Sequence, residues 1–458
     1  MRKIIIQVLI LVLFTAACGG AGETLPSTPQ PVSDQGSGTT SEALMPTATA
    51  EPTATASPAG LIKVDTLEQE IYPFKENGKC SLSEAIIAAN SGKSVDTCAA
   101  GVPGESVIEL MPGTYTLTQL DETPQQEEWA YSARLVGNGL PEVIRSLTIR
   151  GNGATIRREP NAEAFRFFEL LHGTLTIEDL TLHGGDVGDD WGGAIYVFNG
   201  SLVLNNVKLA SNSAENGGGL YFNLGALTAT NSIFENNRAG FAGAGLYLES
   251  AKASLQSVKF IGNHADGIGG GLKAESAAVS VDNSLFIGNI TDGTRGGAIY
   301  ARHVNLQVVR SQFYQNQAYY YGGAISVSNP AIESTDTSDG DPIDQLDQIP
   351  ENTDTLTLVP GLQSTLEAHP SGSFQDLQED AQIHESCFAN NITVNPDEPN
   401  WAAALVGKSN AEGNYFGDPS GPAGMGPGKG DMVGKRITFS PFLTEIPDYC
   451  DPALAQQK

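Results

Sequence analysis

The residues best suited to chemistry lie in short polar segments that recur between residues 186 and 328. One segment contains His264 and Asp266, and the next contains Asp292 and Arg295. Paired carboxylates can cleave a glycosidic bond, and a carboxylate-held calcium ion with a basic residue can eliminate across a uronate. Asp266, Asp292 and Arg295 are therefore the candidates for catalysis, if successive segments lie side by side.

The same segments also carry aromatic residues, which suit binding better than catalysis. The candidates for binding are Trp191, Phe241, Tyr319, Tyr320 and Tyr321. An aromatic ring offers an apolar face, and Trp and Tyr add a polar tip, so such a strip can contact a sugar or another protein. Exposed loops also carry polar residues without any function. Three interpretations stay open: a solvated corner, which is favoured, then a binding strip, and last an active site.

No metal centre is expected, because the histidines are scattered and no pair of them has the spacing of metal ligands.

These segments belong to a cassette that recurs every 25 to 27 residues. Each unit opens with a pair of small residues, mostly Gly-Gly, followed by Ala-Ile or Gly-Leu, as in 192–195, 217–220, 243–246, 269–272, 296–299 and 322–325. Fourteen residues after the aliphatic residue comes Leu or Phe, and three later comes Asn, in the first five units. Fixed spacing inside the unit, with variation only outside it, is typical of a solenoid.

Alternation within the unit decides which kind of solenoid to expect. Apolar or small residues stand seven, five and two positions before each Leu or Phe, for example Leu202, Leu204 and Val207 before Leu209. The residues between them are mostly polar, which predicts strands with one buried face. Such short strands must pair coil on coil, so we expect an all-β, single-stranded parallel β-helix of about nine to eleven coils. Equivalent residues then stack about 4.8 Å apart.

Stacking predicts a structural column of asparagines, because a buried Asn side chain can both donate and accept hydrogen bonds along a strand array. Its members are Asn212, Asn237, Asn263, Asn289, Asn316 and Asn391.

The first 60 residues are expected to stay outside this fold. Residues 1–18 combine a basic start with an apolar stretch and resemble a bacterial lipoprotein signal, which implies that Cys18 is lipidated. Residues 19–60 are rich in Thr, Pro and Ala and predict a disordered tether. Together they imply a protein exported to the bacterial cell envelope and facing the exterior.

Residues 61–106 are predicted to form an N-terminal cap with one short amphipathic helix. Cys80 and Cys98 bracket that helix and are expected to form a disulfide in an exported protein. Residues 80–85, Cys-Ser-Leu-Ser-Glu-Ala, resemble the CSLREA motif of bacterial surface proteins. Those proteins continue as right-handed parallel β-helices, so the resemblance implies that handedness here.

The remaining chain divides at changes of pattern. Coils are expected over 107–327, an acidic loop insertion over 328–380, final coils and a C-terminal cap over 381–446, and a tail over 447–458. Pairing Cys387 with Cys450 would attach the tail to the last full coil. The insertion leaves calcium as a possible ligand, but it lacks the spacing of a calcium loop, so no cofactor is expected.

The Gly-Gly-Ala-Ile and Phe-x-x-Asn elements resemble the repeats of polymorphic outer-membrane proteins, which share the pectin-lyase-like β-helix fold. This resemblance implies a surface adhesin or envelope component, with a polysaccharide lyase or glycoside hydrolase as the alternative. The net charge of −28 excludes nucleic acid as a partner. We expect a monomer that contacts carbohydrate or a surface protein, and a bilayer only through its lipid.

Overall fold

The computed structural model describes residues 60–124, 137–328, 381–394, 405–434 and 437–455, all within one compact unit. They form a right-handed parallel β-solenoid of about nine turns, as the alternation and the resemblance predict. The expected signal peptide with Cys18, almost all of the tether and almost all of the acidic insertion lie outside the described residues.

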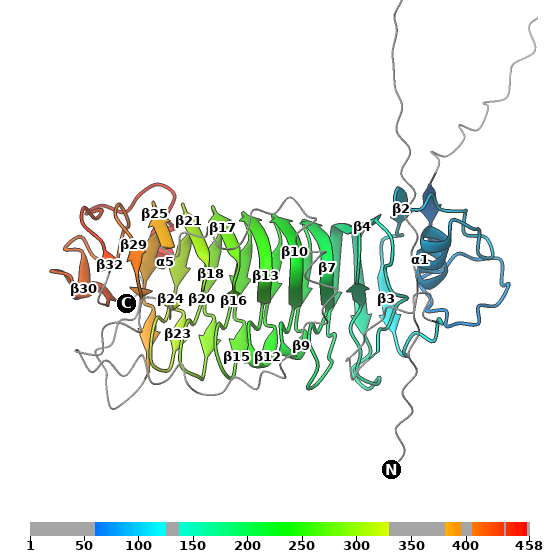
Figure 1. Cartoon of the computed structure of the whole chain (residues 1–458), viewed down its shortest axis with the longest axis horizontal. Helices are drawn as coiled ribbons and strands as arrows, with labels where there is room; N and C mark the ends of the chain where they lie inside the picture. Colours follow the sequence, from blue (N-terminus) through cyan, green and yellow to red (C-terminus); the bar gives the residue numbers. More distant parts are fainter. Residues whose placement is uncertain (1–59, 125–136, 329–380, 395–404, 435–436, 456–458) are drawn as a thin grey trace, which may run out of the picture. The chain divides into compact units, whose positions relative to one another are not determined.

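The first turns are irregular and lead into the repeated coils. Their strands are β1 (Leu61–Lys63), β2 (Ser106–Glu109), β3 (Thr114–Leu117), β4 (Leu147–Arg158), β5 (Phe168–Leu170) and β6 (Thr174–His183). All of these strands pair in parallel with a neighbour, for example β1 with β2, β2 with β4 and β4 with β6. Figure 1 shows the strands following one another from the cap at the right to the C-terminal segment at the left.

Each repeated coil has three strand segments. The first is long, or split in two: β7 (Ile195–Asn205), β10 (Leu220–Thr230), β13 (Leu246–Gln256), β16 (Leu272–Glu275) with β17 (Ala278–Asp282), β20 (Ile299–Arg302) with β21 (Asn305–Val309), and β24 (Ile325–Ser328) with β25 (Ala381–His384). The second is short: β8 (Lys208–Ala210), β11 (Ile233–Glu235), β14 (Lys259–Ile261), β18 (Leu285–Ile287), β22 (Gln312–Tyr314) and β26 (Cys387–Ala389).

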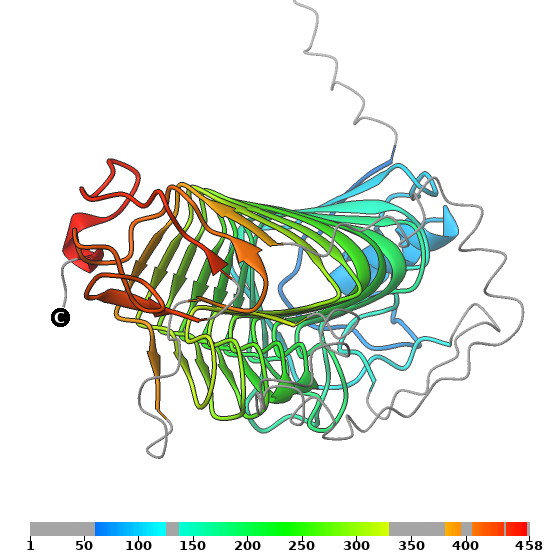
Figure 2. The same ribbon diagram turned by 60° about the vertical axis from the view of Figure 1, so that its left-hand side comes forward.

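The third segment forms a separate six-stranded parallel sheet, named here the corner sheet. Its strands are β9 (Ser213–Asn216), β12 (Arg238–Ala242), β15 (His264–Ala265), β19 (Ile290–Thr291), β23 (Gln317–Ala318) and β27 (Ile392–Thr393). In Figure 1 the corner sheet is the lower row of short strands, where β9, β12, β15 and β23 are labelled, and Figure 2 shows the same stack of coils turned by 60°. Its inward side chains are small, such as Ala239 and Ala265, and its outward ones are mostly polar.

The core consists of columns because the coils pair without a shift in register. Phe234, Phe260, Phe286, Phe313 and Phe388 are fully buried, and neighbouring rings stack with centroids 4.6 to 5.0 Å apart. Strand pairing places each of these residues opposite its equivalent in the next coil. Burial of such large apolar side chains is the main source of stability in a stack of this kind.

The asparagines form a continuous hydrogen-bonded ladder beside the phenylalanine column. Asn263 is typical: its Nδ2 donates to Phe234 O and to Asn289 Oδ1, both at 2.9 Å. Its Oδ1 accepts from the main chain and the side chain of Asn237. The same pattern connects all six predicted ladder members.

A second ladder uses serine hydroxyls at the position two residues before Phe, which is serine in four of the five coils and Val258 in the coil of Phe260. Ser311 N donates to Ser386 Oγ at 3.2 Å, Ser284 N donates to Ser311 Oγ at 3.1 Å, and Val258 N donates to Ser284 Oγ at 3.1 Å. The interior is therefore partly polar, and each buried hydroxyl satisfies a main-chain group of the neighbouring coil.

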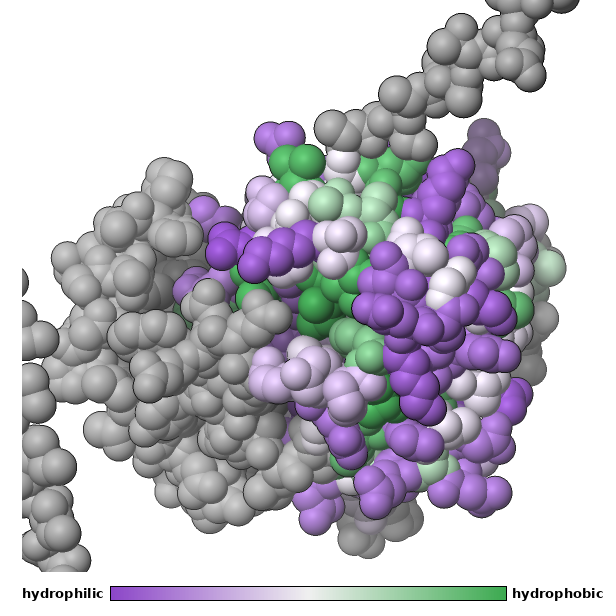
Figure 3. Space-filling view, turned by 90° about the vertical axis from the view of Figure 1, so that its right-hand side faces the viewer, coloured by the Kyte–Doolittle hydropathy of each residue, from purple (hydrophilic) through white to green (hydrophobic). Residues whose placement is uncertain are grey.

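The N-terminal cap contains the predicted helix, α1 (Leu82–Ser91). Ser81 and Glu84 form a reciprocal capping box at its start, and Gly92 ends it with a left-handed conformation (φ 69°). Cys80 pairs with Cys98, as expected, with Cα atoms 4.8 Å apart. Figure 3 looks onto this end of the solenoid, where hydrophilic residues cover much of the described surface and hydrophobic residues show between them.

The C-terminal segment closes the other end. It contains β28 (Leu405–Val406), β29 (Ser409–Asn410), β30 (Pro422–Gly424), β31 (Gly430–Val433), β32 (Ile437–Thr438) and the short helix α5 (Pro452–Ala455). Cys387 of β26 pairs with Cys450, as the sequence suggests. In the part of the chain that the structure describes, neither helix is long or apolar enough to cross a membrane.

Candidate functional site

The corner that precedes each small-residue pair is aligned from coil to coil. Isolated parallel bridges place Trp191 opposite Asn216, Ala242 opposite Ile268, and Arg295 opposite Tyr321. The left-handed glycine that follows, such as Gly243 (φ 61°), turns the chain from the corner sheet into the next long strand. Side chains from different coils are thus collected on one outer edge of the solenoid.

An aromatic cluster, named here the aromatic shelf, covers the first part of this edge. Trp191 stacks on Tyr221 with ring centroids 4.8 Å apart, and Tyr221 stacks in turn on Tyr196 at 5.5 Å. Tyr247 meets Tyr221 edge to face at 5.1 Å. The shelf consists of Trp191, Tyr196, Phe198, Tyr221, Phe241 and Tyr247. Trp191, Phe198 and Phe241 are only partly buried, so solvent reaches their side chains.

Carboxylates and amides border the shelf on the outer side of the long strands. The hydroxyl of Tyr221 donates to Glu249, which also accepts from Asn223 Nδ2 at 2.9 Å. Burial, and then the negative charge of Glu249, raise the pKa of Tyr221 well above its usual value, so its hydroxyl remains a donor. The edge thus combines apolar ring faces with fixed polar groups.

A buried lysine closes the shelf on its C-terminal side. Lys273 is 1 % exposed, and its Nζ lies 2.8 Å from the Tyr247 hydroxyl and 3.1 Å from Glu275 Oε2. The same nitrogen lies 4.3 Å from the centroid of the Tyr247 ring, a cation–π contact. These contacts hold Tyr247 in place and offset the cost of burying the charge.

The three consecutive tyrosines form a smaller, separate group on the same edge. Tyr319 and Tyr320 pack edge to face at 4.6 Å and are both partly exposed. Tyr321 is buried, and the guanidinium of Arg295 lies 5.4 Å from its ring centroid. Of these three predicted binding residues, only Tyr319 and Tyr320 present surface to a ligand.

The proposed catalytic residues are only partly brought together. Arg295 is 4 % exposed and so is not an accessible base. Asp266 and Asp292 lie in one outward row on the corner sheet, where the backbone N–H of Asp292 donates to Ala265 O. Asp266 pairs with Arg238 at 2.7 Å and Asp292 pairs with His264 at 2.8 Å. Both aspartates are well exposed, so neither has the dry environment that makes a carboxyl group a strong general acid.

One further carboxylate faces the same row. Burial, and then the nearby charges of Asp189 and Asp266, raise the pKa of Glu215. Gly240 stands between Glu215 and Asp266 in the row, and a Cβ at Gly240 would collide with Glu215 Oε2. The missing side chain of Gly240 therefore leaves room for the Glu215 carboxylate to lie over the backbone of Gly240 in the next coil.

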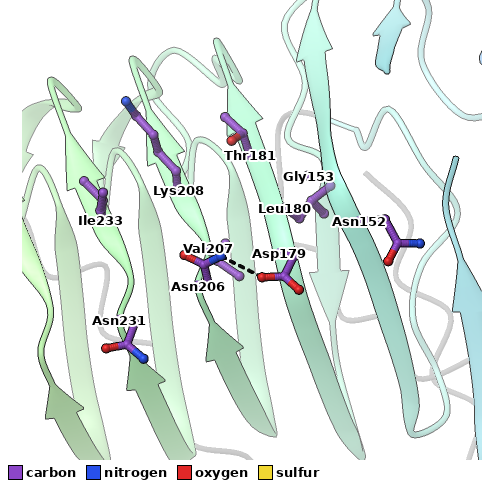
Figure 4. A pocket seen from close by; sticks show the side chains of 10 residues that line it. All are labelled: Asn152, Gly153, Asp179, Leu180, Thr181, Asn206, Val207, Lys208, Asn231 and Ile233. Carbon is purple, nitrogen blue, oxygen red and sulfur yellow. Dashed lines mark hydrogen bonds between the residues drawn. The ribbon is translucent and has the colours of Figure 1, made fainter. Parts of the chain in front are cut away.

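An open groove of about 350 Å³ lies on a different corner of the solenoid. Figure 4 shows Asp179 and Asn206 side by side there, joined by a hydrogen bond of 2.6 Å. Asn152, Asp179, Asn206 and Asn231 all have positive φ, between 49° and 54°, so each turns the chain sharply, the first two within β4 and β6 and the last two between consecutive strands. The groove is the outer side of these turns, and its central polar groups bond to each other.

Sequence reasoning missed the tyrosine column, Lys273 and the proximity of His264 to Asp292. A signal for the column is present, since Tyr follows the last aliphatic residue of the cassette at Tyr196, Tyr221, Tyr247 and Tyr300. A second signal is a separation of 28 residues, one coil plus two, which joins Tyr221 to Glu249, Arg238 to Asp266 and His264 to Asp292.

Comparisons with protein-family models, with curated proteins and with solved structures give no match to this chain.

Proposed function

We propose that this protein binds carbohydrate at the aromatic shelf, as a component of the bacterial cell surface. The observation that supports the proposal is the row of partly exposed rings at Trp191, Phe198 and Phe241, backed by buried tyrosines. The apolar face of a sugar ring packs on aromatic side chains, and its hydroxyls bond to nearby carboxylates and amides. Glu249 and Asn223 supply such groups beside the rings.

Rigidity of the shelf favours binding over incidental exposure. Tyr221 is 2 % exposed and contacts Trp191, Tyr196 and Tyr247 on three sides. Rings that are already fixed lose little conformational freedom when a ligand binds, so more of the contact energy remains as affinity. Packing of this kind therefore favours a binding surface over a solvated corner without function.

Binding is tested with a glycan array, using the purified full chain with Cys18→Ser to avoid lipidation. A glycan that binds the wild-type shelf should bind Trp191→Ala at least about 10-fold more weakly, which is the effect of about 1.4 kcal/mol. Tyr72→Ala is the matched control, because Tyr72 is an exposed aromatic residue of the N-terminal cap. Equal binding by Trp191→Ala and the wild type would place the ligand elsewhere.

Polysaccharide cleavage is the competing function, and a separate experiment tests it. Incubation of uronate-containing polysaccharides with and without calcium should release no unsaturated product if the protein only binds. Calcium-dependent product that is lost in Asp292→Asn would instead support a lyase of the pectin-lyase-like fold.

The proposal includes an anchor at the N-terminus. The sequence around Cys18 resembles a lipoprotein signal, and a lipid there would hold the solenoid at the bacterial envelope. Labelled palmitate should be incorporated into the wild-type chain in bacteria and not into Cys18→Ser. Cell-surface exposure is then checked by protease accessibility on intact cells.

A further inference from the structure

Three side chains of the corner sheet form a ligand set for a metal ion. His264 Nε2 and one carboxylate oxygen each of Asp266 and Asp292 all lie within 4.8 Å of one another. They come from two adjacent coils, His264 from β15, with Asp266 directly after it, and Asp292 directly after β19. The register between these strands fixes their relative positions.

We propose that His264, Asp266 and Asp292 bind a divalent first-row transition cation, with Zn²⁺ as the representative ion. An imidazole with two carboxylates suits such a cation better than Ca²⁺, which prefers oxygen ligands alone. Metal–ligand bonds of about 2.0–2.2 Å bring ligand atoms within roughly 4.4 Å of each other. Because the side chains of His264 and Asp292 are 31 % and 60 % exposed, small rotations can close the remaining gap.

Arg238 occupies the position of a residue that orients a metal ligand. Its Nη2 donates to Asp266 Oδ1 at 2.7 Å, which leaves Asp266 Oδ2 for the cation. An outer partner of this kind fixes the carboxylate and limits the repulsion between neighbouring acidic groups.

Glu215 supplies negative charge on the other side of the set. Its carboxylate lies above Gly240, in the gap that the missing side chain leaves between Glu215 and Asp266. Glu215 is not part of the group of ligand atoms that lie within 4.8 Å of one another, so it adds negative charge beside the triad and is not proposed as a ligand.

A bound cation would connect two consecutive coils on the outside of the solenoid. In the structure, the hydrogen bond between His264 and Asp292 at 2.8 Å already joins the two coils, beside the main-chain bond from Asp292 N to Ala265 O. The inference depends on these residues alone and does not require the aromatic shelf to bind carbohydrate.

The test is isothermal titration of the metal-free full chain, with Cys18→Ser, by Zn²⁺ in the presence of excess Ca²⁺. We expect one Zn²⁺ equivalent to bind the parent protein and to be lost, or weakened at least about 10-fold, in His264→Ala and in Asp292→Asn. His183→Ala is the control, because His183 is an exposed histidine on β6, and it should leave that equivalent unchanged. All three substitutions lie on the surface, and circular dichroism checks that each variant is folded.

Thermal unfolding provides a second readout. Zn²⁺ should raise the unfolding temperature of the parent protein and of His183→Ala, because a ligand of the native state stabilises it. It should not raise that of His264→Ala. The proposal is overturned if the parent binds no Zn²⁺, or if His264→Ala and Asp292→Asn keep the same stoichiometry and affinity.

Discussion

Asp431 ends the asparagine ladder at Asn391. One oxygen of the Asp431 carboxylate accepts from the main-chain N–H of Asn391 at 3.1 Å and from its Nδ2 at 2.7 Å. These are the two donors that each ladder member offers to the Asn of the next coil. The C-terminal segment thus supplies a carboxylate where another coil would supply an amide, and the ladder ends with its donors satisfied.

This terminal carboxylate should make stability depend on pH. Burial raises the pKa of Asp431 from 3.8 to about 6, and the hydrogen bonds from Asn391 only partly oppose it. Between these values the native state holds a proton that the unfolded chain has lost. The contribution of Asp431 to the unfolding free energy is therefore largest below about pH 4 and falls, by up to about 3 kcal/mol, as pH rises through 6.

Other carboxylates titrate in the same range, so the measurement compares wild type with Asp431→Asn. The amide keeps the acceptor oxygen and cannot ionise. Thermal unfolding at pH 5 and pH 7.5 should show that Asp431→Asn gains stability relative to wild type at the higher pH. A difference that is the same at both pH values would contradict the ladder-end role of an ionisable group.

Within the ladder, Asn263→Ala should be strongly destabilising. The substitution removes bonds to Phe234 O and Asn289 Oδ1 and leaves two donors of Asn237 without their acceptor. Unsatisfied buried groups cost about 1–3 kcal/mol each, so the two donors of Asn237 predict a loss of about 2–6 kcal/mol in chemical unfolding. Asn305→Ala is the control, since Asn305 is a partly exposed residue of β21, and it should cost less than about 0.5 kcal/mol.

The phenylalanine column predicts a graded response to side-chain size. Phe260 is fully buried, and its ring centroid lies 4.7 Å from that of Phe234 and 4.6 Å from that of Phe286. Phe260→Ala should lower the unfolding free energy by about 3–5 kcal/mol, because it creates a cavity. Phe260→Leu fills most of that space and should cost about 1.5 kcal/mol or less. Equal effects of the two variants would mean that the column is not tightly packed.

The disulfide of the N-terminal cap should stabilise the fold by closing a loop in the unfolded chain. Cys80 and Cys98 are both 1 % exposed, so substitution tests the bond more cleanly than a reductant does. The double variant Cys80→Ser, Cys98→Ser should lose about 2–4 kcal/mol, with the earliest hydrogen exchange in α1. Cys18→Ser is the control and should leave the unfolding curve unchanged.

The core columns could be predicted because a solenoid converts sequence spacing directly into contact. Phe260 and Phe286 are one period apart, and parallel pairing without a shift must place one above the other. The same reasoning predicts the ladder from Asn212 to Asn391. The serine ladder is less predictable, because Ser284 and Ser311 stand where any small residue fits, and their spacing does not show which groups their hydroxyls bond.

The contacts on the outer edge are harder to predict because they depend on the side-chain conformations. His264 and Asp292 fall in successive corner segments, but their spacing does not show that the His264 ring meets Asp292, two positions further along the chain than its direct equivalent. Lys273 stands in a column of tyrosines, where a charge would be expected to face solvent. It is buried because the Tyr247 ring, Glu275 and the corner residue Phe241 surround it. Backbone spacing alone does not determine such arrangements.

Unbroken register means that a whole coil behaves as one replaceable unit. Leu246 lies opposite Leu272, 26 residues later, and the phenylalanine column and the asparagine ladder both continue across that step. Excision of residues 246–271 would therefore join matching ends, with Phe234 meeting Phe286 and Asn237 meeting Asn289. Descendants of this chain can lengthen or shorten by duplication or loss of such a segment, and selection can then change the surface of the spare copy while its interior stays the same.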